Sequence, residues 1–275
     1  MKLLKRTASL VLALSFLIPT FSFVACEKDE ANGLPEPPPV SSDDAVTPPS
    51  DDKVEDTPVV QPTVQKAQYL RCNSNSVNFR SGAGTEYAVL GQAHENEAYA
   101  VLEKKGNWYK TYYRGKVAYI YASYATVFTI EKSDNEKAEN AIAEGYKLLG
   151  VPYVYGAVRL HDGKGNFLKG FTAQKFDCSS LVQYMFYHGA GKLLDVTTRT
   201  QVVQGEYVSR ANLKRGDCIY FTNESRQHLT GINRVGHVAV YLGDNYILHT
   251  ASDYARIEKI TASRWKHYIE SRRFV

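Results

Sequence analysis

Three residues of this chain combine side chains and sequence contexts that suit nucleophilic catalysis. Cys178 lies in FDCSSLVQYMF, whose apolar residues follow helical spacing and place the thiol in the first turn of a helix. His237 in VGHVAVYLG and His249 in YILHT lie on consecutive predicted strands. A thiol becomes an effective nucleophile when a nearby imidazole takes its proton, and a helix N-terminus favours the thiolate. The pattern predicts a cysteine nucleophile with a histidine base.

The two histidines meet only if their strands pair in a suitable register. A hairpin around Gly243-Asp244-Asn245 is expected to join the strands. A three- or five-residue loop centred on Gly243 would place positions 237 and 249 directly opposite, whereas a two-residue loop would stagger them. The catalytic interpretation requires the first register.

The elements that must position these side chains follow an α+β order. A capping box of Ser133 with Glu136 predicts the start of one helix, which Gly150 stops. The other expected elements are helices at about 178–188 and after the Thr198–Gln201 box, and strands at 218–221, 236–243, 245–250 and 255–260. Helices packed on an antiparallel sheet are the predicted architecture of this half.

The preceding region, residues 67–129, has the pattern of a small all-β barrel. It consists of short strand-like runs separated by glycines and is rich in tyrosine. Its blocks VNFRSGAGTEYAVLG and GNWYKTYYRGKVAYIYASYA resemble the bacterial SH3-like domain. The resemblance implies either a module that binds cell-wall peptides or a barrel that packs on the next domain and shapes one wall of its cleft.

The N-terminus has the layout of an export signal. Basic residues precede a mostly apolar run at 10–24, which ends at Ala25-Cys26. This end resembles a bacterial lipoprotein box, which implies a signal peptide at 1–25, lipidation of Cys26 and an N-terminal lipid anchor in the membrane. We therefore expect the protein to be anchored at the periplasmic or the cell-surface face of the outer membrane. Phe23 stands where that family usually has leucine, so an ordinary cleaved signal is the alternative.

The segment that follows, residues 26–66, cannot bury a hydrophobic core. It holds most of the chain's 10 prolines, is strongly acidic and has almost no aromatic side chain, so we expect a disordered tether. The rest of the chain is correspondingly basic. No nucleic-acid motif accompanies that charge and the chain is expected to be exported, so an anionic cell-wall polymer is the predicted partner and nucleic acid is not.

The second half resembles the NlpC family of cell-wall peptidases. The matching blocks are LLGVPYVYGA, FDCSSLVQY, RTQ, LKRGDCIYF, GHVAVYLG and ILHTA, within a domain expected at 133–275. The resemblance implies a compact papain-like fold in which Cys178 is the nucleophile, His237 the base and His249 the residue that orients the base. The chain departs from the family pattern at Ala157, Lys175 and Ser180.

The family implies a substrate and further site residues. Its members typically cut the γ-D-glutamyl–diamino acid bond of peptidoglycan stem peptides, and those of this layout often require a free N-terminal L-alanine. The predicted substrate-binding residues are Asp177, Ser179 and Tyr155, with Asp177 as the partner of the substrate ammonium group or, alternatively, a cap of the helix. The backbone N–H of Cys178 would bind the oxyanion, together with the hydroxyl of Tyr155 or Tyr153.

Other chemistry-bearing residues favour structural roles. The remaining histidines have no metal-ligand spacing, so we expect no metal and no cofactor. Cys72 and Cys218 are expected to be core residues, and the sequence does not decide whether they form a disulfide. The tripeptide Arg215-Gly216-Asp217 is expected to form a turn. Two other functions stay open: a noncatalytic wall-binding lipoprotein, and amidase or acyl-transfer chemistry on the same fold.

Overall fold

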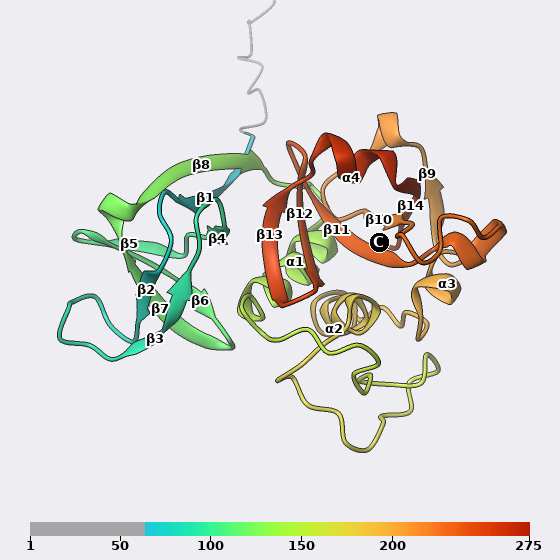
Figure 1. The fold of residues 1–275 in the computed structure, drawn as a ribbon, viewed down its shortest axis with the longest axis horizontal. Coiled ribbons are helices and arrows are strands. Elements are labelled where there is room, and N and C mark those ends of the chain that lie inside the picture. The colour runs from blue at the N-terminus through green and yellow to red at the C-terminus, as the bar shows by residue number, and fades with distance from the viewer. Residues whose placement is uncertain (1–63) are drawn as a thin grey trace, which may run out of the picture. The chain divides into compact units, whose positions relative to one another are not determined.

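The computed structural model describes residues 64–275 (Figure 1). The signal peptide expected at 1–25, the lipidation of Cys26 and nearly all of the tether lie outside the described residues. Within 64–275, no helix has the length and apolar composition needed to cross a bilayer. The helices are α1 Glu136–Lys147, α2 Cys178–Ala190, α3 Thr198–Gln201 and α4 Ala262–Lys266, with 3₁₀ turns at Ala122–Tyr124, Arg210–Asn212 and Gly231–Arg234.

The strands fall into an N-terminal and a C-terminal set. The first set is β1 Lys66–Cys72, β2 Val77–Arg80, β3 Val89–Ala93, β4 Ala98–Ala100, β5 Glu103–Lys105, β6 Trp108–Tyr113, β7 Lys116–Tyr121 and β8 Ala125–Glu131. The second set is β9 Glu206–Val208, β10 Cys218–Phe221, β11 His237–Gly243, β12 Tyr246–Ala251, β13 Tyr254–Lys259 and β14 Tyr268–Arg273. This arrangement confirms the predicted α+β class with an all-β region before it.

The N-terminal strands divide between two sheets. One sheet has five strands in the order β3-β2-β7-β6-β5. Strands β1, β4 and β8 instead belong to a nine-stranded antiparallel sheet in the order β8-β1-β4-β13-β12-β11-β10-β14-β9. The join is the pairing of Ala98 in β4 with Ile257 in β13. The N-terminal region therefore extends the sheet that carries both histidines, which the sequence did not predict.

Helix α1 begins later than its predicted capping box. Asn135 is the N-cap residue, and its side chain accepts a hydrogen bond from the N–H of Ala138 at 3.2 Å. The box of Ser133 with Glu136 is wrong, because Ser133 lies before the helix and its hydroxyl accepts from the N–H of Asn135. Asn135 still has extended backbone, so no helical turn can start at Ser133.

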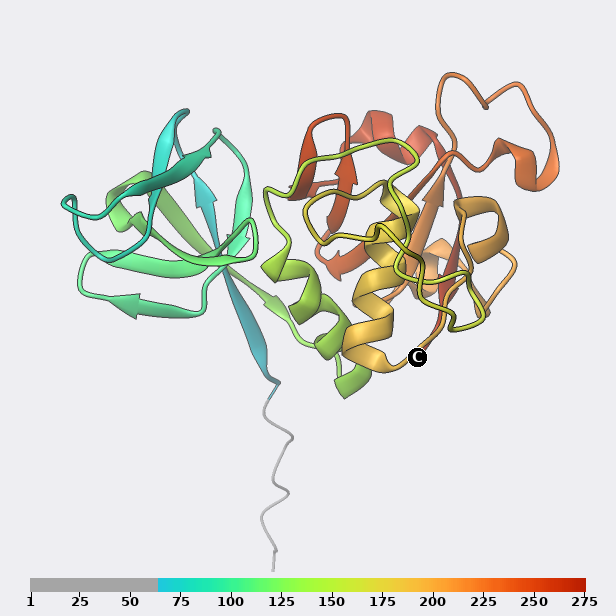
Figure 2. The same ribbon diagram turned by 90° about the horizontal axis from the view of Figure 1, so that it is seen from below.

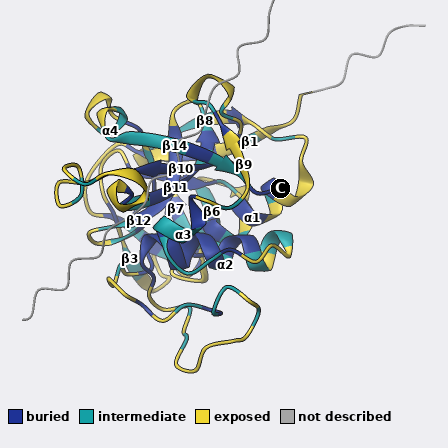
Figure 3. Cartoon of the chain, turned by 90° about the vertical axis from the view of Figure 1, so that its right-hand side faces the viewer, coloured by how far each residue is buried: buried dark blue, intermediate teal, exposed yellow. Residues whose placement is uncertain are grey.

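Helix α2 starts at the predicted residue and packs beside α1 (Figures 1 and 2). Asp177 caps it, since its carboxylate accepts from the N–H of Ser180 and the Ser180 hydroxyl accepts from the N–H of Asp177. The helix passes Gly189 and ends at Gly191, whose φ of 63° suits a glycine C-cap. Figure 3 shows α2 with buried strands β10, β11 and β12 above it.

Gly189 allows the close approach of the two helices. A Cβ built on Gly189 would lie 2.4 Å from the backbone N and Cα of Ala141 in α1. We expect Gly189→Ala to lower the free energy of unfolding by about 1–3 kcal/mol, because the backbone must move to relieve the overlap. Urea denaturation measures this loss. The exposed His188 on the same turn supplies the control: His188→Ala is expected to change stability by less than about 0.5 kcal/mol, and equal effects of both substitutions would contradict the account.

Candidate active site

Cys178 and His237 line the same cavity. Cys178 is the first residue of α2 and is 8% exposed, and His237 is the first residue of β11. Both border a cavity of about 610 Å³ whose other walls include Tyr153, Ser252 and Arg264. The backbone N–H of Val238, the residue after His237, acts on the Cys178 thiol and lowers its pKa. The structure thus places the predicted nucleophile and base together.

The hairpin between the histidines has a different register from the expected one. Gly243 pairs with Tyr246 across a two-residue loop, but Val240 pairs with Leu248, because a bulge shifts the register between Tyr241 and Gly243. The expected direct opposition of positions 237 and 249 is therefore wrong. Without the bulge the two-residue loop would place these side chains on opposite faces of the sheet. The bulge restores them to one face as diagonal neighbours.

The two imidazoles form a hydrogen bond despite that offset. His237 Nε2 lies 2.9 Å from His249 Nδ1. His249 is 1% exposed. This contact leaves Nδ1 of His237 as the ring nitrogen that can exchange a proton with a group in the cavity. The predicted orienting contact from His249 is thus present geometrically.

Glu258 and Arg264 continue the line of contacts that begins with the two imidazoles, and the sequence did not predict either residue as part of the site. Glu258 Oε1 lies 3.1 Å from His249 Nε2 and 2.7 Å from Arg264 Nη2. In the β12–β13 pairing His249 faces Arg256, so Glu258 is its diagonal neighbour on the same face. Alternating polar residues in the predicted strand 255–260 were the only available signal.

Burial disfavours the charged forms of the predicted nucleophile and base. Burial, aided by the charge of Asp177, raises the pKa of the Cys178 thiol to about 12, although backbone N–H groups act against it. Burial, with His249 and Arg264 adding to it, holds the pKa of His237 well below its usual value. The effect of burial on the thiol thus outweighs the helix N-terminus, which favours the thiolate. The lowered pKa of His237 favours its neutral form, which can accept the thiol proton.

The oxyanion donors differ in part from the expectation. The N–H of Cys178 belongs to the first turn of α2, where N–H groups lack intrahelical partners. Tyr153 lines the cavity, but Tyr155 is not among the residues lining it and is 83% exposed. The cause is a turn in which the N–H of Ala157 donates to the carbonyl of Val154, which directs Tyr155 to solvent. The structure does not bring Tyr155 to the site.

Asp177 and Ser179 face the protein interior. Asp177 is 4% exposed, and its Oδ2 accepts from Arg159 Nη2 at 2.8 Å. Ser179 is 3% exposed, and its hydroxyl donates to Asp177 Oδ1 at 3.0 Å. Asp177 thus fills the alternative capping role, and its part in ammonium binding stays a prediction. Nothing in the sequence indicated Arg159.

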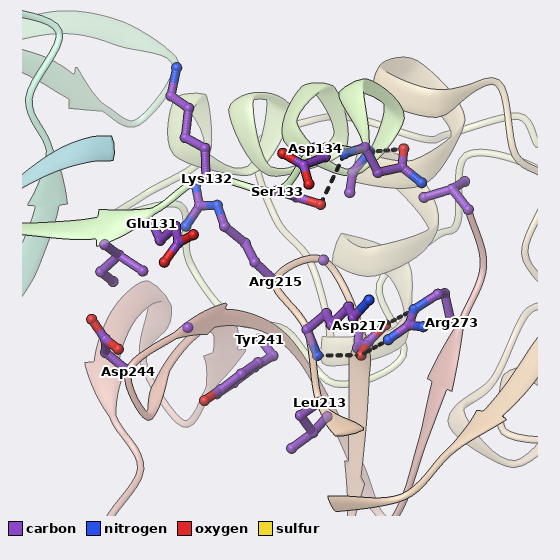
Figure 4. Close-up of a pocket in the computed structure, with 17 residues that line it drawn as sticks. Glu131, Lys132, Ser133, Asp134, Leu213, Arg215, Asp217, Tyr241, Asp244 and Arg273 are labelled. Carbon is purple, nitrogen blue, oxygen red and sulfur yellow. Dashed lines mark hydrogen bonds and ion pairs between the residues drawn. The ribbon is translucent and has the colours of Figure 1, made fainter. Parts of the chain in front are cut away.

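A second cavity, of about 540 Å³, contains the Arg215-Gly216-Asp217 turn (Figure 4). Asp217 is 1% exposed and accepts two hydrogen bonds from Arg273, each 2.8 Å long. Arg215 is 7% exposed and pairs with Glu139 of α1. Both charged side chains are engaged within the protein, which confirms the structural interpretation of the tripeptide.

The other two cysteines within residues 64–275 lie in the core. Cys72 and Cys218 are 1% and 0% exposed, and both are free thiols in the core. Among the described residues, no group of three or more histidine, cysteine, aspartate or glutamate side chains is arranged to hold a metal ion. The candidate site consists of Cys178, His237 and His249, with Glu258 beside His249.

Comparison with known proteins gives two family matches, and several relatives that align over part of the chain. Residues 150–273 match the NlpC/P60 family and residues 75–126 match the bacterial SH3 domain. A gamma-DL-glutamyl hydrolase of Bacillus subtilis is 33% identical over 126 residues, which cover 46% of this chain and 26% of the relative. The murein DD-endopeptidase MepS/murein LD-carboxypeptidase of Escherichia coli is 36% identical over 108 residues, which cover 38% of this chain and 53% of the relative.

A solved structure gives a broader alignment. An NlpC/P60 family protein from Bacillus cereus aligns with 76% of this chain and 63% of its own, at 20% identity and a TM-score of 0.40. The family matches cover the two regions that the fold contains, one before α1 and one that carries Cys178, His237 and His249. The chain therefore contains a bacterial SH3 domain followed by a domain of the NlpC/P60 family.

Proposed function

We propose that this protein is a cysteine endopeptidase that hydrolyses peptidoglycan stem peptides. One observation carries the proposal: a thiol at a helix N-terminus borders the same cavity as a histidine that is hydrogen-bonded to a second buried histidine. The peptidoglycan substrate is supported by the relatives, whose names describe murein and peptidoglycan hydrolases. An exported, lipid-anchored location is part of the same proposal and is supported by the N-terminal sequence.

The reaction follows from the positions of these groups. Nδ1 of His237 takes the thiol proton as the sulfur of Cys178 attacks the amide carbonyl carbon. Backbone N–H groups of the first turn of α2 stabilise the oxyanion. The C–N bond then breaks, the amine leaves with the proton from His237, and a thioester remains on Cys178. Water, deprotonated by His237, hydrolyses the thioester and restores the thiol.

The scissile bond we propose is the γ-D-glutamyl–diamino acid bond, with preference for a free N-terminal L-alanine. The gamma-DL-glutamyl hydrolase relative supports a bond to glutamate. Asp177 would be the ammonium partner, and its two oxygens already accept from Arg159, Ser179 and the N–H of Ser180. A substrate amine would therefore add to this network through the remaining lone pairs of the carboxylate.

Product analysis tests this function. The purified protein is incubated with L-Ala-γ-D-Glu-diaminopimelate and with the N-acetylated peptide, and products are identified by mass spectrometry. We expect release of diaminopimelate from the free peptide, and a rate at least about tenfold lower on the acetylated peptide, because the acetylated peptide has no ammonium group to form a charge-assisted hydrogen bond with Asp177. Cys178→Ala is the matched control without a nucleophile.

The other results have defined meanings. Equal cleavage of both peptides would reject recognition of the amine by Asp177 while retaining the peptidase. Cleavage of intact muropeptides at another bond would reject the proposed bond. Absence of hydrolysis of either peptide or of muropeptides by the wild type would favour the noncatalytic binding function.

A further inference from the structure

We propose that Glu258 is a positioning residue of the catalytic apparatus, which fixes the tautomer of His249 and stabilises the positive charge that His237 gains during attack. The inference rests on the proposed function. Its basis is a continuous line of contacts that runs from the cavity along one face of the sheet. His237 Nε2 contacts His249 Nδ1 at 2.9 Å, and His249 Nε2 lies 3.1 Å from Glu258 Oε1.

Proton positions along this line are set by Glu258. His237 must present an unprotonated Nδ1 to the thiol, so in its neutral form it carries its proton on Nε2 and donates to His249. His249 can accept at Nδ1 only if its own proton is on Nε2. A carboxylate beside Nε2 favours that tautomer, as the buried aspartate does in serine-protease triads. Without Glu258, the buried Nε2–H would face no anion.

The negative charge of Glu258 also favours the protonated form of the neighbouring His249. Burial lowers the pKa of His249, and the neighbouring carboxylate of Glu258 acts against that shift. Glu258 lies within ion-pair distance of His249 on β12 and Arg264 on α4, and the charge of Arg256 on its own strand acts on it from further away. Together they hold the pKa of Glu258 at about 2, against the effect of burial, so it is an anion throughout the working pH range.

Glu258 acts from outside the substrate cavity. It is not among the residues that line the cavity of Cys178, and it borders a separate crevice of about 700 Å³ between β13 and the N-terminal region. The charged groups across that crevice are Arg71, His94, Glu95 and Glu97. Because substrate bound at Cys178 does not meet Glu258, its replacement should change kcat and leave KM nearly unchanged.

Two substitutions separate the two roles. Glu258→Leu removes both the acceptor and the charge, and kcat is expected to fall on the order of 10- to 100-fold, as for other lost partners of a functional histidine. Glu258→Gln keeps an acceptor oxygen for His249 Nε2–H and removes only the charge. Its loss in kcat should be smaller, and the acid limb of its pH profile should move to lower pH, because the histidine pair loses a neighbouring anion.

The control and the contrary results are specific. Asp253→Asn removes a carboxylate from the same crevice that pairs with Arg256, and it should leave kcat and the pH profile unchanged. Wild-type kcat in Glu258→Leu, a loss found only in KM, or an unmoved acid limb in Glu258→Gln would overturn the proposal. If Glu258→Leu fails to fold, the isosteric Glu258→Gln still decides.

A measurement without substrate separates this inference from the proposed function. Spectra of ¹⁵N-histidine-labelled protein distinguish protonated from unprotonated ring nitrogens. We expect His249 to be protonated at Nε2 in the wild type, and a mixture of tautomers in Glu258→Leu. An Nδ1-protonated His249 in the wild type would overturn the inference even if the protein hydrolyses peptide, and the expected spectrum would support it even if the peptides tested are not cleaved.

Discussion

Cys178→Ala is expected to lower kcat/KM for stem-peptide hydrolysis by on the order of 10⁴-fold or more, because the thioester cannot form. His237→Ala should cause a comparable loss, since His237 is the group that takes the thiol proton in the proposed reaction. The nucleophile and base act as a unit, so the double variant should be no worse than either single one. Release of soluble peptide, followed by mass spectrometry, measures all three.

Cys218→Ala provides the matched control for the loss of a thiol. Cys218 is 0% exposed and lies in the core, where burial raises the pKa of its thiol well above the usual value. Activity per folded molecule should stay at the wild-type level. A loss in the double variant that equals the product of the two single-variant losses would show that Cys178 and His237 act independently, contrary to the mechanism.

Arg215→Met is expected to give the largest loss of stability, about 3–5 kcal/mol in the free energy of unfolding. The side chain of Arg215 is 4% exposed and pairs with Glu139 of α1 at 2.5 Å. Its guanidinium also donates to the hydroxyls of Tyr69 and Tyr146, each at 2.8 Å, and to the carbonyl of Leu242. These bonds link β1, α1 and β11, and the substitution leaves Glu139 without its cation.

An exposed ion pair serves as the comparison. Lys147 and Glu144 pair at 2.6 Å with side chains 45% and 21% exposed, so Lys147→Met should cost less than about 1 kcal/mol. Urea denaturation of both variants gives the difference. Adding Glu139→Leu to Arg215→Met should recover part of the loss, because no buried charge is then unpaired. A loss below 1 kcal/mol in Arg215→Met would contradict the role assigned to this network.

Local patterns in the sequence predicted much of the site. The apolar spacing after Cys178 places the thiol at the start of α2, and the structure confirms this start. Alternating apolar residues around His237 and His249 predict their strands, which the structure also confirms. These patterns are local because each depends only on which face of one element is buried.

Features that depend on long-range packing could not be predicted. The bulge that returns His237 and His249 to one face depends on the packing of the whole sheet. It lies at Leu242, and a leucine there does not indicate a bulge. Glu258 is one of several charged residues in its strand, and only the β12–β13 register distinguishes it. The continuation of the sheet through Ala98 and Ile257 joins segments that are distant along the chain.

The most direct test of the central claim is to alkylate Cys178 with iodoacetamide and measure the remaining hydrolysis of stem peptide. Peptide mapping by mass spectrometry gives the modified fraction of each cysteine. Cys72 and Cys218 should react far more slowly than Cys178, because Cys178 borders the cavity together with His237 and the other two lie in the core. We predict that activity falls in proportion to the modified fraction of Cys178 and reaches zero when modification is complete. Full hydrolysis by protein whose Cys178 is entirely modified would contradict the account.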